Sequence, residues 1–301
     1  MPESMVYVNG DFVAKSKATV SVFDHGVLYG DGVFEGIRAY NGVVFRLDEH
    51  VERLFNSAKV IHLEIPMTRH EVAEAIMETV RKNQLRDAYI RAVVTRGTGD
   101  LGVDPVSCKT PTIFIIAEAS QSSLVSGVPR LISLVTTSVR RDPVDGTSHE
   151  VKSLNYLNSI LAKMEAKRAG ADDALMLDHR GFVSESSACN IFIVKSNKVS
   201  TPATSAGILH GITRERIIRL CSDLGLDVAE RDITPFELLT ADEAFLVGTK
   251  SEILAVGTVN GTKIGTGTVG PVVRRLTAEF AKVVSRREEG TPAYESEYID
   301  L

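Results

Sequence analysis

A single lysine, Lys152, has the setting that most directly suggests chemistry in this chain. It lies in a short extended run just before a segment with helical spacing. A lysine in a dry, partly apolar site loses its proton more easily, and its neutral amine can form a Schiff base with an aldehyde. Lys152 is also one of 34 lysines and arginines, so taken alone it is better explained as a solvated surface residue.

The segment after Lys152 must position it. Apolar residues recur there at i, i+3, i+4 and i+7, which predicts a helix with one apolar stripe. The stripe consists of Leu157, Ile160, Leu161 and Met164. Gly170 ends this helix, and Ser153 or Asn155 is the candidate cap of its first turn. Lys152 then points from the end of a strand toward the space above the helix start.

If Lys152 holds an aldehyde cofactor such as pyridoxal 5′-phosphate, the chemistry demands three further groups. The ring nitrogen needs a carboxylate beside it. The phosphate needs a helix N-terminus, hydroxyls and a cation, and the substrate carboxylate needs backbone N–H groups or an arginine. The candidates are Glu185 for the ring, residues 211–214 for the phosphate, and residues 248–251 and Arg53 as further hydroxyl, amide and cation sources. Each also fits an ordinary surface, cap or turn position, so only their joint presence is informative.

Composition and charge set the broad class of the protein. The chain has 301 residues, 44% hydrophobic and 24% charged, which is enough for two domains. The net charge of −5 gives no basic surface for nucleic acid. The cysteines are Cys108, Cys189 and Cys221. They form no CxxC pair, so we expect no metal site and no disulfide framework, and a reducing cytoplasm fits. We find neither a signal segment nor an apolar run of membrane-spanning length.

The first part of the chain combines hairpins, helices and strands. Two Asn-Gly pairs predict tight hairpin turns, and Thr68 with Glu71 forms a capping box. The predicted elements are hairpins at residues 7–13 and 33–45, a helix capped by Asp48, a helix from Thr68 to about Lys82, and strands at 89–95 and 112–117. We therefore expect a small α+β domain at residues 1–120, followed by an interdomain connection at 121–130.

The remainder, residues 131–301, is predicted to be one larger domain. Its expected strands are residues 131–139, 173–177, 182 onward, 191–195, 198–201 and 244–247, and its expected helices are 157–169, 213–224, the segment after Thr234-Pro235, and 271–287. Strands and helices do not alternate strictly, which disfavours a Rossmann fold. No GxGxxG motif opens a helix after a strand, and no GxxxxGK[ST] is present.

Three motifs carry a resemblance to a known family. They are Phe23–Arg38, Ala88–Arg91 and Lys152–Tyr156, followed in order by Val183–Glu185, Gly211–Arg214 and Gly248–Thr249. With these motifs the chain resembles the branched-chain amino acid aminotransferases, class IV aminotransferases among the fold-type IV pyridoxal-phosphate enzymes, from Val20 to about Phe280. The resemblance implies an α+β fold of two domains, with a small N-terminal α/β domain and a larger β-barrel-like domain with helices.

The implied reaction is a ping-pong transamination of L-leucine, L-isoleucine or L-valine with 2-oxoglutarate, which gives branched-chain 2-oxo acids and L-glutamate. Lys152 is implied as the catalytic Schiff-base lysine, which also moves the α-proton. Glu185 is implied as the partner of the pyridine nitrogen, and Tyr156 as the residue that hydrogen-bonds the phenolic oxygen of the cofactor. The implied phosphate-binding residues are Arg53, Leu209, Ile212, Thr213 and Thr249.

The resemblance also implies a substrate site and an assembly. The implied substrate residues are Tyr89, Thr249 and Lys250 for the α-carboxylate, Arg91 and Tyr29 for the glutamate side chain, and Phe34, Gly36 and Arg38 around the side-chain pocket. Leu101 and Val103 match a loop that enters the site of the neighbouring subunit, and Tyr29 is lent across the same interface. The implied partners are amino acids, 2-oxo acids and a second copy of the chain, in a dimer at least.

Some positions depart from the family pattern, and other functions of the same fold stay open. Residues 186–189 replace a more glycine-rich segment, Lys250 replaces a small residue, and the connection at 121–126 lacks an aromatic residue. D-amino acid aminotransferases, (R)-amine transaminases and aminodeoxychorismate lyases share the lysine and the phosphate site. Phe34–Arg38 and Tyr89–Arg91 favour the branched-chain pattern. A non-catalytic pyridoxal-phosphate binder is a further alternative, against which the intact lysine, glutamate and tyrosine argue.

Overall fold

The computed structural model describes residues 3–294 and divides the chain into two compact units. The first unit consists of the chain up to Gln121, the segment Val151–Asn155, and the chain from Val284 onward. The second unit consists of Ser122–Glu150 and Tyr156–Val283. The predicted contiguous domains, 1–120 and 131–301, differ from this division, because Val151–Asn155 and the chain from Val284 onward belong to the first unit. The role of residues 121–130 as the interdomain connection stays a prediction.

The lysine segment belongs to the first unit because it extends the sheet of that unit. The Phe34 N–H donates to the Lys152 carbonyl at 3.0 Å, and the Leu154 N–H donates to the Gly32 carbonyl at 2.9 Å. Ser153 pairs with Val33 as an isolated antiparallel bridge. Lys152 is therefore fixed by backbone hydrogen bonds to residues more than a hundred positions away, which no local sequence pattern reports.

The first unit is built on a seven-stranded antiparallel sheet in the order β16-β4-β3-β5-β6-β1-β2. Its strands are β1 (Met5–Val8), β2 (Asp11–Ala14), β3 (Gly32–Tyr40), β4 (Val43–Phe45), β5 (Ala88–Thr95), β6 (Thr112–Ala119) and β16 (Gly290–Pro292). Both predicted hairpins are confirmed. Asn9 and Gly10 have φ of 49° and 105°, and Asn41 and Gly42 have φ of 45° and 80°. Positive φ at both turn residues is what two-residue hairpin turns require and what Asn-Gly tolerates.

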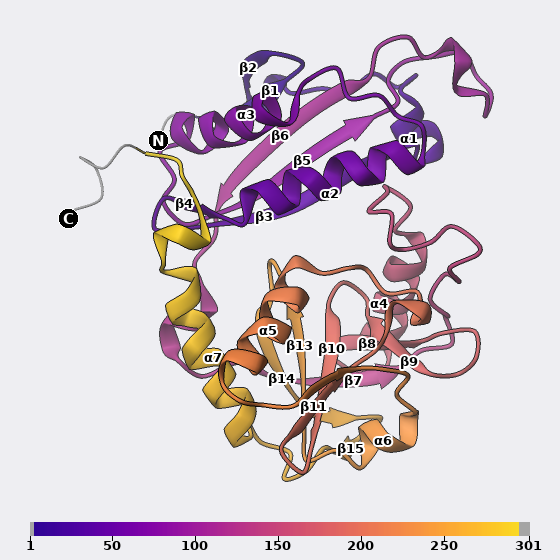
Figure 1. Cartoon of the computed structure of the whole chain (residues 1–301). Helices are drawn as coiled ribbons and strands as arrows, with labels where there is room; N and C mark the ends of the chain where they lie inside the picture. Colours follow the sequence, from indigo (N-terminus) through magenta and orange to yellow (C-terminus); the bar gives the residue numbers. More distant parts are fainter. Residues whose placement is uncertain (1–2, 295–301) are drawn as a thin grey trace. The chain divides into compact units, whose positions relative to one another are not determined.

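Helices α2 and α3 lie along one face of this sheet (Figure 1). The helices of the unit are α1 (His25–Tyr29), α2 (Leu47–Val60) and α3 (Arg69–Lys82), with short 3₁₀ turns η1 (Lys15–Lys17), η2 (Pro105–Ser107) and η5 (Arg287–Glu289). The capping box of α3 is confirmed. The predicted cap of α2 is wrong, because Arg46 occupies the N-cap without a side-chain bond. Asp48 lies in the first turn instead, where its charge favours the helix dipole.

The second unit contains a nine-stranded sheet that closes on itself. The order is β12-β11-β10-β13-β14-β7-β8-β9, β15 pairs with β14, and a β9–β10 pairing between Glu185 and Asn190 completes a ring of six strands. This confirms the barrel-like domain. The strands are β7 (Leu131–Thr136), β8 (Asp173–Leu177), β9 (Val183–Ser186), β10 (Asn190–Lys195), β11 (Lys198–Thr201), β12 (Val228–Glu230), β13 (Glu243–Gly248), β14 (Glu252–Val259) and β15 (Thr262–Lys263). Sequence analysis missed β12, β14 and β15.

The helices of the second unit are α4 (Leu157–Arg168), α5 (Ile212–Asp223), α6 (Pro235–Leu239) and α7 (Pro271–Val284), with 3₁₀ turns η3 (Ser123–Ser126) and η4 (Thr204–Ala206). The cap predicted for α4 is wrong. Tyr156 is the N-cap residue without a side-chain bond, and the Ser153 hydroxyl accepts from the Asn155 N–H instead. The apolar stripe of α4 does not face the core of this unit. Leu157 is 65% exposed, whereas the small residues Ala162 and Ala166 of the same helix are buried.

Within residues 3–294, no helix is both long and apolar enough to cross a membrane.

Candidate active site

The amine of Lys152 lies in an apolar and cationic setting in the first unit. The residue is partly buried, and its Nζ lies 4.6 Å from the centroid of the Phe34 ring. The Lys152 N–H donates to the Ser57 hydroxyl of α2 at 3.1 Å. Burial and, after it, the nearby Arg53 guanidinium together lower the pKa of Lys152 to about 8. The interpretation of Lys152 as an ordinary solvated lysine is therefore wrong.

One face of the sheet carries the predicted substrate residues that lie on β3 and β5. Arg38 pairs with Tyr89, and Gly36 pairs with Arg91, in the antiparallel register of β3 and β5. Opposite residues of such a pair project to the same face. The Arg91 Nη2 donates to the Tyr89 hydroxyl at 2.9 Å, and its guanidinium lies 4.5 Å from the centroid of the Phe34 ring. An aromatic and cationic surface thus surrounds Gly36.

The space above Gly36 is taken by a neighbouring side chain. A Cβ at residue 36 would lie 2.4 Å from the Tyr89 hydroxyl oxygen. Glycine is therefore needed here so that Tyr89 can reach Arg91. Arg38, further along β3, is buried and donates from Nη2 to the Ser120 carbonyl at 3.1 Å. It therefore joins β3 to the segment that follows β6.

Arg53 belongs to a buried polar cluster that sequence analysis did not predict. The Glu35 carboxylate accepts from Arg53 Nε at 2.6 Å and from Arg53 Nη2 at 2.9 Å. His50 Nδ1 lies 2.8 Å from the same carboxylate. Burial alone would raise the pKa of Glu35, but Arg53 and His50 together hold it well below its ordinary value. The available signal was a glutamate inside an otherwise largely apolar strand.

Three further residues predicted for the substrate site, Tyr29, Leu101 and Val103, meet at one loop of this unit. The Tyr29 hydroxyl accepts from the Gly102 N–H at 2.8 Å, and its ring packs edge-on against His25. Leu101 and Val103, on either side of Gly102, are 73% and 85% exposed. Tyr29 therefore holds a loop that presents two apolar side chains to the outside of this chain.

In the second unit, the Glu185 carboxylate is surrounded by donors. Asn190 Nδ2 donates to Oε2 at 2.8 Å, and the Leu209 N–H donates to Oε1 at 3.3 Å. Arg141 Nε lies 3.4 Å from Oε1, and His149 Nε2 lies 3.6 Å from it. Glu185 and Arg141 are both buried. A carboxylate fixed in this way can accept a further hydrogen bond from a protonated ring nitrogen.

The other predicted residues of this unit lie at the ends of neighbouring elements. The ring of Tyr156 packs against that of His149, with centroids 5.1 Å apart. Ile212 and Thr213 open α5, whose N-cap is Gly211 and which no side chain caps. Such a helix start can bind an anion through its N–H groups. A Cβ at residue 211 would lie 2.1 Å from Asn190 Oδ1, so glycine is needed for Asn190 to reach the carboxylate.

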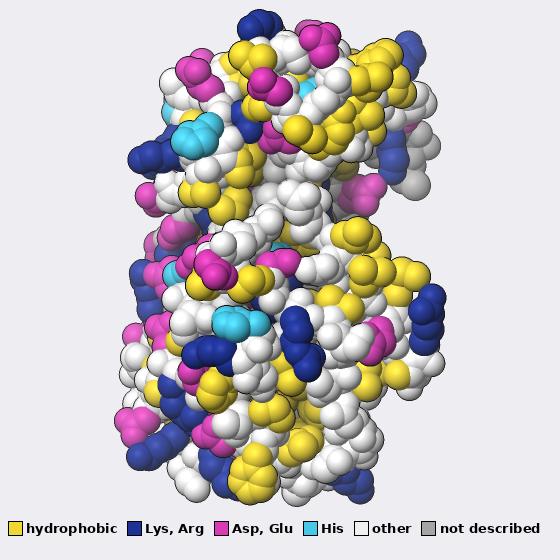
Figure 2. Space-filling model, turned by 90° about the vertical axis from the view of Figure 1, so that its right-hand side faces the viewer, with side chains coloured by type: hydrophobic (Ala, Val, Ile, Leu, Met, Phe, Trp, Pro, Cys, Tyr) yellow, Lys and Arg dark blue, Asp and Glu magenta, His cyan; other side chains and the backbone are white. Residues whose placement is uncertain are grey.

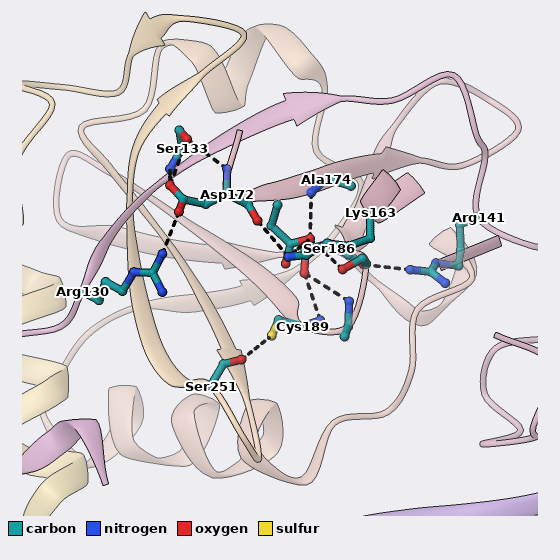
Figure 3. A network of polar contacts seen from close by, with 12 residues as sticks. Arg130, Ser133, Arg141, Lys163, Asp172, Ala174, Ser186, Cys189 and Ser251 are labelled. Atoms are coloured by element: carbon teal, nitrogen blue, oxygen red, sulfur yellow. Dashed lines mark hydrogen bonds and ion pairs between the residues drawn. The ribbon is translucent and has the colours of Figure 1, made fainter. Parts of the chain in front are cut away.

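Residues 186–189, where the family pattern has more glycine, are held by polar contacts of Ser186 and Cys189, which Figure 3 shows. The Ser186 hydroxyl accepts from the Cys189 N–H at 3.0 Å, and Arg141 Nη2 donates to the Ser186 carbonyl at 2.8 Å. Cys189 Sγ lies 3.2 Å from the Ser251 hydroxyl. Burial raises the pKa of Cys189 to about 11, so its thiol stays protonated. These bonds join the turn to the segment between β13 and β14 that carries Thr249 and Lys250.

The structure thus assembles the predicted residues into two sets, one in each unit. The first set joins Lys152, Phe34, Tyr89, Arg91 and Arg53, and the second gathers Glu185, Leu209, Tyr156, the start of α5 and the end of β13. Sequence analysis missed Glu35, His50, Arg141, His149 and Asn190, which hold the predicted residues in place. Among the described residues, no group of three His, Cys, Asp or Glu side chains is placed to bind a metal. Each unit thus supplies groups of the kinds that pyridoxal phosphate needs, an amine in the first and a carboxylate and an open helix start in the second.

Comparison with known proteins places the chain in a family. It belongs to the class IV amino-transferase family, whose profile matches residues 32–259. Within that family it is similar to branched-chain-amino-acid aminotransferases. The enzyme of Pseudomonas aeruginosa is 38% identical over 296 residues, 95% of each chain. A relative in Methanocaldococcus jannaschii is 50% identical over 290 residues, 96% of this chain and 99% of its own. The resemblance inferred from the motifs is therefore confirmed.

Comparison with solved structures gives the same family. The solved branched-chain amino acid aminotransferase of T.th., in complex with pyridoxamine 5′-phosphate, matches with a TM-score of 0.91 and 39% identity, covering 99% of this chain and 97% of that one. The branched-chain aminotransferase of Thermoproteus uzoniensis, solved with norvaline, matches with a TM-score of 0.90 and 37% identity, covering 97% and 100%. The predicted α+β fold of fold-type IV is confirmed.

Proposed function

We propose that this chain is a branched-chain amino acid transaminase that uses pyridoxal 5′-phosphate and 2-oxoglutarate. The observation that carries the proposal is the amine of Lys152, partly buried against Phe34, whose pKa is lowered to about 8. The solved T.th. relative supports it, because that protein was solved with N-(5'-phosphopyridoxyl)-L-glutamate and with 4-methylvaleric acid. A cofactor adduct of glutamate and a leucine-like acid therefore both bind to one such protein.

The residues of this chain fit the cofactor. When bound, pyridoxal phosphate supplies an aldehyde and an electron-withdrawing ring that makes the α-proton of an amino acid acidic. In this proposal Lys152 holds the aldehyde and, as a neutral amine, moves the α-proton. Glu185 keeps the ring nitrogen protonated, and Tyr156 hydrogen-bonds the phenolic oxygen. The implied phosphate-binding residues are Arg53, Leu209, Ile212, Thr213 and Thr249.

The same pocket must accept an apolar side chain and the carboxylate of glutamate. In this proposal, as the resemblance implies, the apolar walls are Phe34 and Tyr156, with Leu101 and Val103 from a second subunit. Arg91, which is stacked on Phe34, can pair with a carboxylate when glutamate enters. In this proposal the α-carboxylate is bound by Tyr89 and by the amides of Thr249 and Lys250. Tyr29 of the second subunit assists Arg91, and Gly36 and Arg38 shape the pocket.

A donor screen tests this function. L-leucine, L-isoleucine, L-valine, D-alanine and a chiral primary amine are compared with 2-oxoglutarate as acceptor, and glutamate formation is measured. We expect the three L-branched amino acids to be the best donors, with D-alanine at least about 100-fold lower in kcat/KM, a difference of about 2.7 kcal/mol in transition-state binding. D-alanine or the amine as the best donor would contradict the branched-chain assignment and favour another member of the fold.

We also propose that the protein works as a homodimer at least, in the cytoplasm. Figure 2 shows hydrophobic side chains gathered on the surface of the molecule. In the second unit, the α4 stripe is exposed, with Leu157 at 65% and Ile160 at 52%. Exposed apolar patches of this kind mark protein interfaces. The exposed stripe therefore supports contact with a second copy of the chain. Such a contact is also needed if Tyr29, Leu101 and Val103 contribute to the site of the neighbouring subunit, as the resemblance implies.

Charging the α4 stripe should separate the subunits. We expect the Leu157→Glu/Ile160→Glu double variant to halve the mass measured by light scattering and to lose activity together with the mass, because buried carboxylates cost several kcal/mol. Phe236→Glu is the matched control, since Phe236 is 73% exposed on α6. A double variant with unchanged mass would exclude this face as the interface.

A further inference from the structure

The Glu35 carboxylate ties a strand to two side chains of one helix. Glu35 lies in the middle of β3, whose nine residues are all buried. It contacts His50 and Arg53 of α2, which are one helical turn apart and therefore share a face. The side chains of Glu35 and His50 are each 1% exposed, and that of Arg53 is 13% exposed. These three side chains therefore form a buried polar cluster, not an ion pair on the surface.

The geometry fixes the plane and direction of the Arg53 guanidinium. Nε and Nη2 donate to different oxygens of Glu35, at 2.6 and 2.9 Å. A two-point contact of this kind defines orientation as well as energy. It also occupies one edge of the guanidinium, so an anion bound in addition by Arg53 must approach the edge between Nη1 and Nη2. His50 holds Oε2 from the other side and prevents the carboxylate from turning.

We propose that Glu35, supported by His50, is a positioning residue that aims Arg53 at the phosphate ester of the cofactor. This inference rests on the proposed function. Glu35 acts through Arg53 and is not itself a ligand of the cofactor. A flexible arginine would lose side-chain entropy on binding an anion, whereas one already held by Glu35 has lost it on folding. The same carboxylate offsets the charge of Arg53, which lies close to the amine of Lys152.

The competing explanation is that Glu35 only neutralises a buried arginine and stabilises β3 against α2. The two explanations differ in what they predict for a ligand without a phosphate. A positioning role affects the phosphate ester selectively, because Arg53 has no contact to make with the unphosphorylated compound. A purely structural role weakens both ligands alike.

The test compares pyridoxal 5′-phosphate with pyridoxal on the full-length protein. Glu35→Gln keeps the shape of the side chain but removes its charge and replaces one acceptor by a donor. After removal of bound cofactor, both compounds are titrated by absorbance. We expect Glu35→Gln to raise the dissociation constant of pyridoxal 5′-phosphate at least about 10-fold and that of pyridoxal less than about 2-fold. Arg53→Lys should show the same selectivity, and Glu118→Gln, an exposed partner of Lys15, should change neither.

Equal losses for the two compounds, or no loss for either, would overturn the positioning role. If Glu35→Gln gives no cooperatively unfolding protein, Glu35→Asp and His50→Leu decide the question. Both keep a carboxylate for Arg53 but disturb its placement, and both should weaken the phosphate ester selectively. An unselective or absent effect in them would again overturn the inference. Wild-type protein that fails to bind pyridoxal 5′-phosphate would instead contradict the proposed function.

Discussion

Replacing Lys152 by alanine is expected to lower turnover of L-leucine with 2-oxoglutarate by at least about 10⁴-fold. A positioned general base alone contributes about 10²–10⁴-fold, and loss of the nucleophilic amine adds to it. The partly buried Nζ, 4.6 Å from the centroid of the Phe34 ring, has the setting that both roles need. Steady-state kcat/KM measures the loss. Lys59→Ala, on the exposed face of α2, is the control and should retain wild-type activity.

Two further measurements keep this prediction specific to Lys152. Borohydride treatment of the loaded wild-type protein should fix the cofactor on the peptide that contains Lys152. In cofactor-free protein, reaction of this amine with an acylating reagent should have a midpoint near pH 8 instead of the ordinary 10.5, because burial and Arg53 disfavour its charged form. Labelling of a different lysine, or a Lys152→Ala variant with more than about a tenth of wild-type activity, would show that the lysine is misassigned.

The lowered pKa of Lys152 also has a consequence for folding. Between about pH 8 and pH 10.5 the unfolded chain binds more protons at this amine than the folded chain does. The contribution of Lys152 to the stability of the cofactor-free protein therefore rises with pH across that window. The burial of this amine is a cost at neutral pH, as expected for a group whose position serves a reaction.

Local elements of this fold could be predicted because their causes are local. The Asn-Gly pairs at residues 9–10 and 41–42 adopt the positive φ that their hairpins need. The capping boxes of α3 and α6 form between a threonine and a glutamate three residues later. In each case the stabilising contact lies within four residues of the chain, so the pattern in the sequence contains the whole argument.

Elements held by distant partners could not be predicted in the same way. Strand β14 begins with Glu252, whose φ is 55°, and contains Gly257, so it lacks the signature of a strand. It forms because β13 and β7 lie on either side of it. The α4 stripe has helical spacing, which predicts an amphipathic helix but not which partner covers its apolar face. In this chain that face is exposed.

In the candidate site, too, residues in recognisable motifs could be predicted, whereas the distant partners that hold them could not. Glu35 lies inside the motif Phe23–Arg38 but was assigned no role there, and Arg141 lies in none of the motifs. Glu35 is visible only as a charge in a buried strand, and its function depends on His50 and Arg53 from the next helix. Arg141 reaches Glu185 across more than forty positions. Buried charges need partners, but the sequence does not say which.

Replacing Glu185 by glutamine should lower kcat/KM for L-leucine by about 10²–10³-fold, the magnitude found when a single preorganised electrostatic contact is removed. The carboxylate accepts from Asn190 Nδ2 and the Leu209 N–H, and Arg141 Nε lies 3.4 Å away. A neutral amide cannot keep the pyridine nitrogen protonated, so the ring withdraws electrons less well. We therefore expect the loss mainly in kcat, with a changed nitrogen-15 shift for the labelled ring nitrogen of the bound cofactor.

The same substitution should also destabilise the protein. Because the groups around Glu185 are donors, the amide of glutamine must place its own NH₂ against one of them, which costs about 1–3 kcal/mol. Chemical denaturation measures this loss. Glu165→Gln is the control, because this partly buried carboxylate on α4 also accepts hydrogen bonds, from the Ser138 N–H and hydroxyl, and should lose less stability. A Glu185→Gln protein that is less stable yet keeps wild-type kcat and an unchanged ring-nitrogen shift would show that this carboxylate organises Asn190, Leu209 and Arg141 and has no part in the chemistry.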